Sequence, residues 1–276
     1  MQVKKINNFV IKPIHGKGES DNRPIKGKDL IPMLYCVTFI VAKKNSGKTT
    51  VIANILRNCV GRDTKVVVFC ATLNNDPTWV AIREMLENLG VEFTGYTSIY
   101  DENKVNRIKQ WLLDKQAEKE AEAERETVPE EKINDARVLL AEPVEPEEPK
   151  VRKKKKSKYR APETFFVFDD LSGELRDPSV AELIRVMRHH HTKIILSSQY
   201  LKDITPAAAQ NVDYWMAFRG LSDEYIQRIH ELGSPSMDLE TFSKMYALAT
   251  KEKYGFLYAG VKTDDYRIGF SQAFTI

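Results

Sequence analysis

The feature that most constrains the fold is an apolar strand that leads directly into a short polar loop, in the stretch CVTFIVAKKNSGKTTVIANIL at residues 36 to 56. The apolar run MLYCVTFIVA is typical of a buried strand. Residues 49 to 58 then carry apolar side chains on one face of a helix: Val51, Ile52, Ile55 and Leu56. A Gly-Lys-Thr loop between a strand and a helix presents backbone N–H groups and a helix N-terminus to an anion. The stretch therefore predicts a phosphate-binding loop.

The loop departs from the usual pattern at one position. Residues 42 to 49, AKKNSGKT, follow the order G-x-x-x-x-G-K-[ST], except that Ala42 replaces the first glycine. Alanine tolerates most backbone conformations but not a left-handed one, so the loop can work if φ at residue 42 is negative. We expect Lys48 on the β and γ phosphates of ATP and Thr49 on Mg²⁺. The whole predicted nucleotide-binding set is Lys44, Asn45, Ser46, Gly47, Lys48, Thr49 and Thr50.

Two carboxylates follow a second apolar strand, in TFFVFDD at residues 164 to 170. The end of such a strand is where the acidic residue of a magnesium nucleotide site must lie. We assign Asp169 to Mg²⁺ through water, and Asp170 to orienting or deprotonating the attacking water. A turn at the strand end explains one aspartate but gives no reason for two.

The next strand, IILSSQ, ends in Gln199, at the sheet edge where open α/β folds bind ligands. Gln199 has two alternative roles here: sensing the γ-phosphate or positioning the water, or closing a loop through its amide.

The helix predicted for residues 178 to 190 carries Arg185, Arg188 and His189 away from its apolar face. This cationic face can supply an arginine finger to a neighbouring subunit, with Arg188 ahead of Arg185, contact DNA phosphate, or be solvated. The tract at residues 189 to 191 is not predicted as a metal site, because no second Cys or His cluster completes it.

The order of elements predicts the fold class and one large domain. Strands alternating with helices imply an α/β fold of the P-loop NTPase type (RecA/FtsK-like), with a mainly parallel central sheet and helices on both faces. We expect an N-terminal arm at residues 1–34 and an ATPase domain at 35–276. A charged, flexible insertion at 114–162 interrupts it, with opposed charge blocks that predict a solvated helix and then disorder. Its basic run at 151–160 is open to three uses: a linker, a DNA-phosphate contact or a nuclear import signal.

Composition excludes several classes. The net charge of +3 does not by itself indicate nucleic-acid binding. The apolar run at residues 30 to 42 is shorter than the roughly 20 residues of a membrane span, so we expect no membrane segment. The N-terminus lacks the features of a secretory signal, which leads us to expect an intracellular protein. Cys36 and Cys70 fall in predicted core strands, and we expect neither a disulfide nor a metal role for them.

Three segments together resemble the genome-packaging ATPases of large double-stranded DNA viruses and their relatives, the poxvirus-type branch of the FtsK/HerA superfamily. They are AKKNSGKTT, FFVFDDLSG and RHHHTKIILSSQYLKDITPAAAQNVDYWMAFRG. The resemblance matches the family's nucleotide motifs at Lys48, Thr49, Asp169, Asp170 and Gln199. Ala42 departs from the usual loop, and Asp170 stands where many relatives have Glu.

The resemblance implies a motor that hydrolyses ATP to move viral double-stranded DNA into a preformed capsid. Its implied partners are DNA, other copies of the chain in a ring, and a capsid or capsid-vertex protein. Its implied location is the host cytoplasm or viral factory, with virion association and, from the basic run, the nucleus as alternatives. Two other functions stay open: another DNA-translocating or terminase-like P-loop ATPase, and a non-hydrolysing nucleotide-binding scaffold. A terminase usually adds a nuclease domain, for which we expect too little chain after Phe270.

Overall fold

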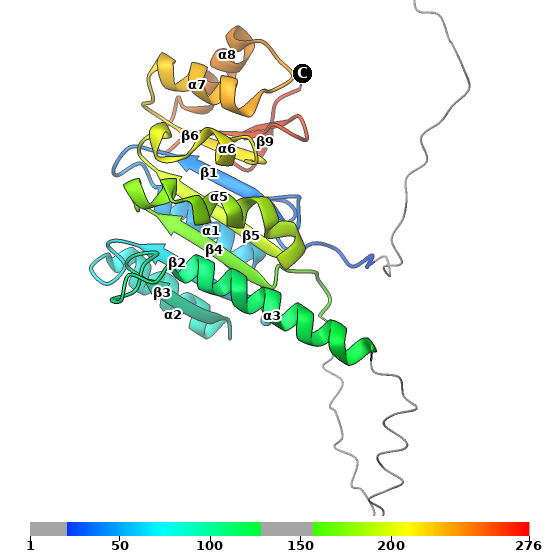
Figure 1. Cartoon of the computed structure of the whole chain (residues 1–276). Helices are drawn as coiled ribbons and strands as arrows, with labels where there is room; N and C mark the ends of the chain where they lie inside the picture. Colours follow the sequence, from blue (N-terminus) through cyan, green and yellow to red (C-terminus); the bar gives the residue numbers. More distant parts are fainter. Residues whose placement is uncertain (1–20, 128–156, 276) are drawn as a thin grey trace, which may run out of the picture.

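The central feature of the fold is one large sheet, seen in a computed structural model that describes residues 21–127 and 157–275 (Figure 1). Its strands are β1 (Val37–Val41), β2 (Lys65–Cys70), β3 (Glu92–Tyr96), β4 (Thr164–Asp169), β5 (Thr192–Ser198), β6 (Tyr214–Phe218), β7 (Phe256–Gly260), β8 (Asp265–Ile268) and β9 (Gln272–Ala273). They lie in the order β3-β2-β4-β5-β1-β6-β7-β8-β9. The first six are parallel, and β7 to β9 are antiparallel at one end of the sheet. The predicted α/β fold with a mainly parallel sheet is therefore confirmed.

Helices cover both faces of this sheet. They are α1 (Lys48–Cys59), α2 (Pro77–Asn88), α3 (Arg107–Thr127), α5 (Pro178–Val186), α6 (Pro206–Ala209), α7 (Asp223–Gly233) and α8 (Leu239–Ala249), with short 3₁₀ turns η1 (Ser172–Arg176), η2 (Met187–His190) and η3 (Leu201–Asp203). One buried apolar cluster lies between the sheet and α1 and α2, and includes Ile52 and Trp79. The other lies between the sheet and α3, α5, α7 and α8, and includes Leu183 and Phe242. The sheet is thus packed between two separate apolar cores.

Most local predictions agree with these elements. Asp76 and Asp177 cap α2 and α5 through their side chains, each with a proline at the first helical position. The helix predicted for 178 to 190 ends at Val186 and tightens into η2. Strand β3 was not predicted from the sequence.

The two ends of the predicted insertion differ. The helix α3 continues to Thr127, and its side chains from 118 to 124 are exposed. Residues 128–156, which include most of the basic run, lie outside the described residues. Arg160 forms a β-bridge with Ile25, and its backbone also bonds to Lys26. The last residues of the predicted insertion are therefore held against the predicted N-terminal arm.

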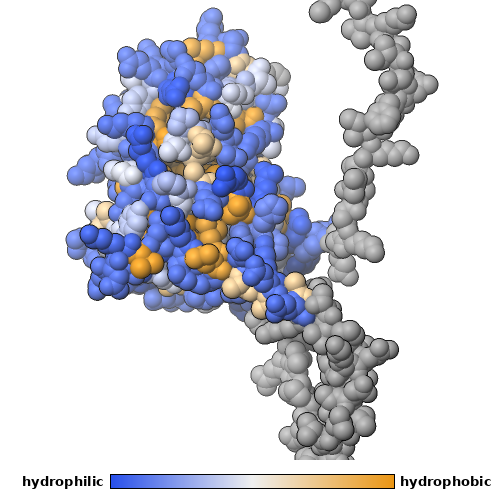
Figure 2. Space-filling model, in the orientation of Figure 1, coloured by the Kyte–Doolittle hydropathy of each residue, from blue (hydrophilic) through white to orange (hydrophobic). Residues whose placement is uncertain are grey.

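The outer surface is mostly polar. Blue, hydrophilic residues dominate the face in Figure 2, with apolar residues in separate patches. Within residues 21–127 and 157–275, no helix has the length and apolar character needed to cross a bilayer. Cys36, Cys59 and Cys70 are free and buried, and burial raises the pKa of the Cys36 thiol to about 12. The predicted core role of Cys36 and Cys70 is confirmed.

Candidate nucleotide site

The predicted site residues gather at the carboxyl edge of the parallel strands. In neighbouring strands β2, β4 and β5, the residues Cys70, Asp169 and Ser197 lie side by side in register. Strand β1 is the next strand along, and the phosphate-binding loop leaves from its carboxyl end. Parallel strands bring all these ends to one edge, which explains how an aspartate far along the chain reaches the loop.

The loop between β1 and α1 has the backbone conformation of a phosphate cradle. Asn45 and Gly47 are left-handed, with φ of 61° and 90°. Ala42 is not among the described residues with positive φ; it is fully buried, and its N–H donates to the carbonyl of Ser198 at 3.1 Å. The predicted condition for alanine at this position is therefore met. The first N–H groups of an α-helix have no acceptor within the helix. Gly47, the N-cap of α1, has no side chain that could accept from them.

Lys48 joins the loop to the two aspartates. Its Nζ lies 3.0 Å from Oδ1 of Asp169 and also forms an ion pair with Asp170. Lys48 and Asp169 are buried, whereas the side chain of Asp170 is 33% exposed. Burial of the ammonium acts to lower the pKa of Lys48, but the charges of both carboxylates outweigh it and raise that pKa. The three predicted side chains thus form one charged cluster, in which both carboxylates favour the protonated lysine.

Two hydroxyl groups at this edge are buried without a hydrogen-bond partner in the described parts of the chain, Ser46 Oγ and Ser197 Oγ. A buried polar group without a partner costs about 1–3 kcal/mol, so such atoms indicate a place for a ligand or water. Ser46 belongs to the loop, and Ser197 is the register neighbour of Asp169. These donors and Lys48 fit a phosphate chain.

The residues also fit magnesium in the manner of P-loop proteins. Such sites use one loop hydroxyl, an acidic residue, phosphate oxygens and water, so they need no dense protein cage. Thr49 follows Lys48 in the first turn of α1, and Asp169 lies against Lys48. Within the described ranges, no group of three or more His, Cys, Asp or Glu side chains forms a metal cluster.

Gln199 lies just beyond β5, half-buried, at the same edge. The preceding residue fixes the turn, because Ser198 Oγ donates to the buried carboxylate of Asp203 and accepts from the N–H of Tyr200 at 3.1 Å. Gln199 is thus brought to the predicted edge, while its catalytic role stays a prediction.

Arg188 is not brought to this site. Its guanidinium lies 3.6 Å from Oδ1 of Asp213, which is buried at the start of β6 and accepts the N–H of Val37 at 2.8 Å. These contacts are at the amino ends of β1 and β6, and the nucleotide loop is at the opposite ends. The predicted roles of this cationic face, an arginine finger for a neighbouring subunit or a DNA-phosphate contact, stay predictions. Arg185 and Arg188 are both exposed, as predicted.

Three residues at the site escaped the sequence analysis. Trp79 donates its indole N–H to Oδ2 of Asp169 at 3.1 Å. Tyr254 packs on the loop, since a Cβ added to Gly47 would lie 3.4 Å from Tyr254 Cδ1. Arg219 follows β6 at the same edge. Only Arg219 had a signal in the sequence, as a cation directly after an apolar strand; the other two contacts depend on long-range packing.

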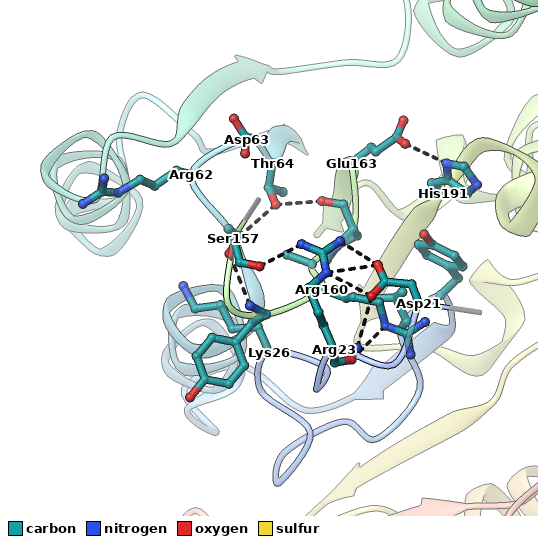
Figure 3. Close-up of a pocket in the computed structure, with 16 residues that line it drawn as sticks. Asp21, Arg23, Lys26, Arg62, Asp63, Thr64, Ser157, Arg160, Glu163 and His191 are labelled. Carbon is teal, nitrogen blue, oxygen red and sulfur yellow. Dashed lines mark hydrogen bonds and ion pairs between the residues drawn. The ribbon is translucent and has the colours of Figure 1, made fainter. Parts of the chain in front are cut away.

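A separate pocket of about 980 Å³ lies at the opposite, amino edge of the sheet (Figure 3). Thr64, Glu163 and His191, which directly precede β2, β4 and β5, contribute to its wall. Glu163 pairs with His191 at 2.7 Å, and Arg23 donates to the carbonyl of Ser157 at 2.8 Å. None of the predicted nucleotide-site residues lines this pocket, so the candidate nucleotide site is separate from it.

The fold and the arrangement of loop, lysine and aspartates define a P-loop NTPase architecture. Among solved structures, the chain is similar to the genome packaging NTPase B204 from Sulfolobus turreted icosahedral virus 2 in complex with AMP, with a TM-score of 0.51 and 14% identity over 85% of this chain and 97% of that one. The complex of B204 with AMPPCP gives a TM-score of 0.50 and 14% identity, with the same coverage of both chains. No protein-family model and no curated protein sequence matches the chain. At this identity the likeness shows a shared fold.

Proposed function

We propose that the chain is an ATP-hydrolysing motor that moves viral double-stranded DNA into preformed capsids, as a ring of identical subunits. The observation that carries the proposal is the buried Lys48 held between Asp169 and Asp170 beneath a left-handed loop. The shared fold with a genome packaging NTPase solved with AMP and AMPPCP supports a nucleotide ligand and a role in genome packaging.

Each charged residue has a distinct role in this proposal. Magnesium-bound ATP supplies the cleavable phosphoanhydride and the cation that offsets its charge. Lys48 exchanges its carboxylate partners for phosphate oxygens, which frees Asp170. Asp170, the more exposed of the two aspartates, then orients or deprotonates the attacking water. Asp169, which is buried, and the hydroxyl of Thr49 would hold Mg²⁺, Asp169 through water.

Two further residues complete the proposed site. Gln199 senses the γ-phosphate or positions the water from the end of β5. Arg188 acts as an arginine finger on a neighbouring subunit, since its place at the amino edge keeps it from the loop of its own chain. The proposed chemistry therefore needs a ring of subunits. The ring binds a capsid or capsid-vertex protein. The proposed location is the host cytoplasm or viral factory.

The test is phosphate release from ATP by the assembled protein, with and without double-stranded DNA. We expect hydrolysis that DNA stimulates. Lys48→Ala should weaken nucleotide binding about 10–100-fold, because hydrogen bonds to charged groups contribute roughly 1.5–3 kcal/mol. Lys244→Ala is the matched control, since it removes a surface lysine that pairs with Glu240 in its own helix.

A second variant separates chemistry from binding. Asp170→Asn should lower kcat about 10²–10⁴-fold, the usual range for a lost general base. Asp223→Asn, at the exposed start of α7, should leave kcat unchanged. Hydrolysis that DNA does not stimulate would favour another P-loop ATPase, and nucleotide binding without hydrolysis would favour the scaffold.

A further inference from the structure

The carboxylate of Asp169 has a second donor besides Lys48. Trp79, in the first turn of α2, is 1% exposed and donates its indole N–H to Oδ2 of Asp169 at 3.1 Å. Lys48 Nζ binds the other oxygen, Oδ1, at 3.0 Å. Each oxygen of this buried carboxylate therefore has one protein donor, and the two donors come from different helices.

The position of the indole is fixed by the start of α2. The side chain of Asp76 accepts the N–H of Thr78 at 2.8 Å, and Pro77 occupies the first helical position. Trp79 follows directly, so the cap sets the direction in which its side chain leaves the helix. Its ring packs in the apolar cluster between α1, α2 and the sheet.

Burial of a tryptophan does not by itself require such a partner in this protein. Trp215 is equally buried, and its indole N–H has no hydrogen-bond partner among residues 21–127 and 157–275. The bond from Trp79 to Asp169 is therefore a particular feature of the nucleotide site. A bond from a neutral donor to a carboxylate is charge-assisted and directional, which suits it to fixing the plane of the group.

We propose that Trp79 is a positioning residue for the magnesium side of the site. Its indole N–H holds Oδ2 of Asp169, so that Oδ1 alone changes its partner when nucleotide and Mg²⁺ bind. This inference rests on the proposed function. When Lys48 moves to phosphate, Oδ1 loses its partner and becomes the acceptor for metal-bound water. A carboxylate anchored at one oxygen keeps its orientation through this exchange, whereas an unanchored one rotates. Outer-shell partners of this kind typically contribute 10–100-fold to metal affinity.

The test compares two identical substitutions in the full-length chain. Trp79→Phe keeps an aromatic ring in the core and removes the N–H, and Trp215→Phe makes the same change where the N–H has no bond to lose. Titration of Mg²⁺ in the presence of AMPPCP should show a metal affinity at least 10-fold weaker for Trp79→Phe. Trp215→Phe should stay within about twofold of the parent chain, and both variants should bind AMPPCP without Mg²⁺ as the parent does.

A spectroscopic measurement covers the case in which Trp79→Phe does not fold. A chain with Trp111→Phe and Trp215→Phe keeps Trp79 as its one tryptophan, because the sequence contains three. Its emission should shift when Mg²⁺ is added to the AMPPCP complex, since the charge beside Asp169 changes, and should not shift with Mg²⁺ alone.

Metal affinity of Trp79→Phe within twofold of the parent, or Trp79 emission that Mg²⁺ leaves unchanged in the AMPPCP complex, would overturn the proposal. The readouts use a non-hydrolysed nucleotide, so they are independent of turnover. A chain that binds Mg²⁺ and AMPPCP in a Trp79-dependent way but hydrolyses no ATP would refute the motor and leave this inference standing.

Discussion

Restoring the usual first glycine of the loop, by Ala42→Gly, should weaken the fold without improving the nucleotide site. The methyl group of Ala42 is fully buried in the cluster beneath α1, and the backbone there is not left-handed. Glycine therefore adds a conformational freedom that the native loop does not use. Loss of a buried methyl costs about 0.8 kcal/mol, and the greater entropy of the unfolded chain adds about 0.4–1 kcal/mol. The expected cost is about 1–2 kcal/mol, or roughly 2–8 °C in Tm at about 2–4 °C per kcal/mol for a domain of this size class.

The assays are thermal unfolding of the free chain and calorimetric titration with AMPPCP. The affinity of Ala42→Gly for AMPPCP should stay within about twofold of the parent. Gly47→Ala is the contrasting variant: a left-handed alanine costs about 1–2 kcal/mol, and the distortion falls where the phosphates bind. We expect it to lose affinity as well as stability. A tenfold gain in affinity, or a higher Tm, for Ala42→Gly would refute the conclusion that residue 42 needs no glycine.

Three other substitutions test the packing of the fold and of the loop. Asp177→Ala should cost about 1–2 kcal/mol of unfolding free energy, as a lost helix cap. Burial acts to raise the pKa of Asp177, but hydrogen bonds, including one from Tyr100, outweigh it and lower that pKa. The stabilisation by Asp177 should therefore be complete above the ordinary carboxyl pKa of about 4 and disappear as the pH falls below it. Urea unfolding at a series of pH values measures this loss. Lys193→Met should stabilise the fold by about 1–3 kcal/mol in urea, because this fully buried ammonium has no hydrogen-bond partner in the described parts of the chain. Tyr254→Ala should lower AMPPCP affinity severalfold in calorimetry by removing the contact with Gly47, and Tyr254→Phe should not.

The sequence predicted the parts of the site that depend on local pattern. The strand before Lys48 and the helix after it follow from apolar spacing, and two helix starts follow from an Asp-Pro pair. The meeting of Lys48 with Asp169 also followed, because parallel strands share a carboxyl edge. What the sequence could not predict was a partner chosen by the packing of distant elements, such as Trp79 for Asp169.

Other features that could not be predicted have a similar cause. The short strand β3 (EFTGY) is half-buried at the sheet edge, so it lacks the continuous apolar run that marks the central strands. Helix periodicity placed Arg188 on an exposed face, as the structure has it, but it carried no information on which end of the sheet that face approaches. The pairing with Asp213 fixes it at the amino edge. Contacts of this kind need the register of β1 and β6, which no single segment contains.

The place of the charged segment in the fold leads to a last prediction. Both described ends of residues 128–156 lie away from the nucleotide loop: Lys119 in α3 donates to the carbonyl of His189 at 2.6 Å, and Arg160 bonds to Pro24 and Lys26. Replacing 128–156 by a Gly-Ser linker should therefore leave AMPPCP affinity and basal ATP hydrolysis within about twofold.

The stimulation of ATP hydrolysis by DNA in the deleted chain then distinguishes between the possible roles of the basic run. A linker role predicts unchanged stimulation, whereas binding to DNA phosphates predicts weaker DNA binding with a shallower salt dependence, by about 0.9 in log–log slope for each phosphate that is no longer neutralised. A matched chain that keeps 128–156 but has Lys153, Lys154, Lys155 and Lys156 changed to Gln separates charge from length. Loss of AMPPCP binding in the deleted chain, measured where its Tm is unchanged, would contradict the separation of this segment from the site. The prediction rests on the described flanks of the segment, because the loop, Lys48 and both aspartates lie at the carboxyl edge of the sheet and these flanks contact other elements.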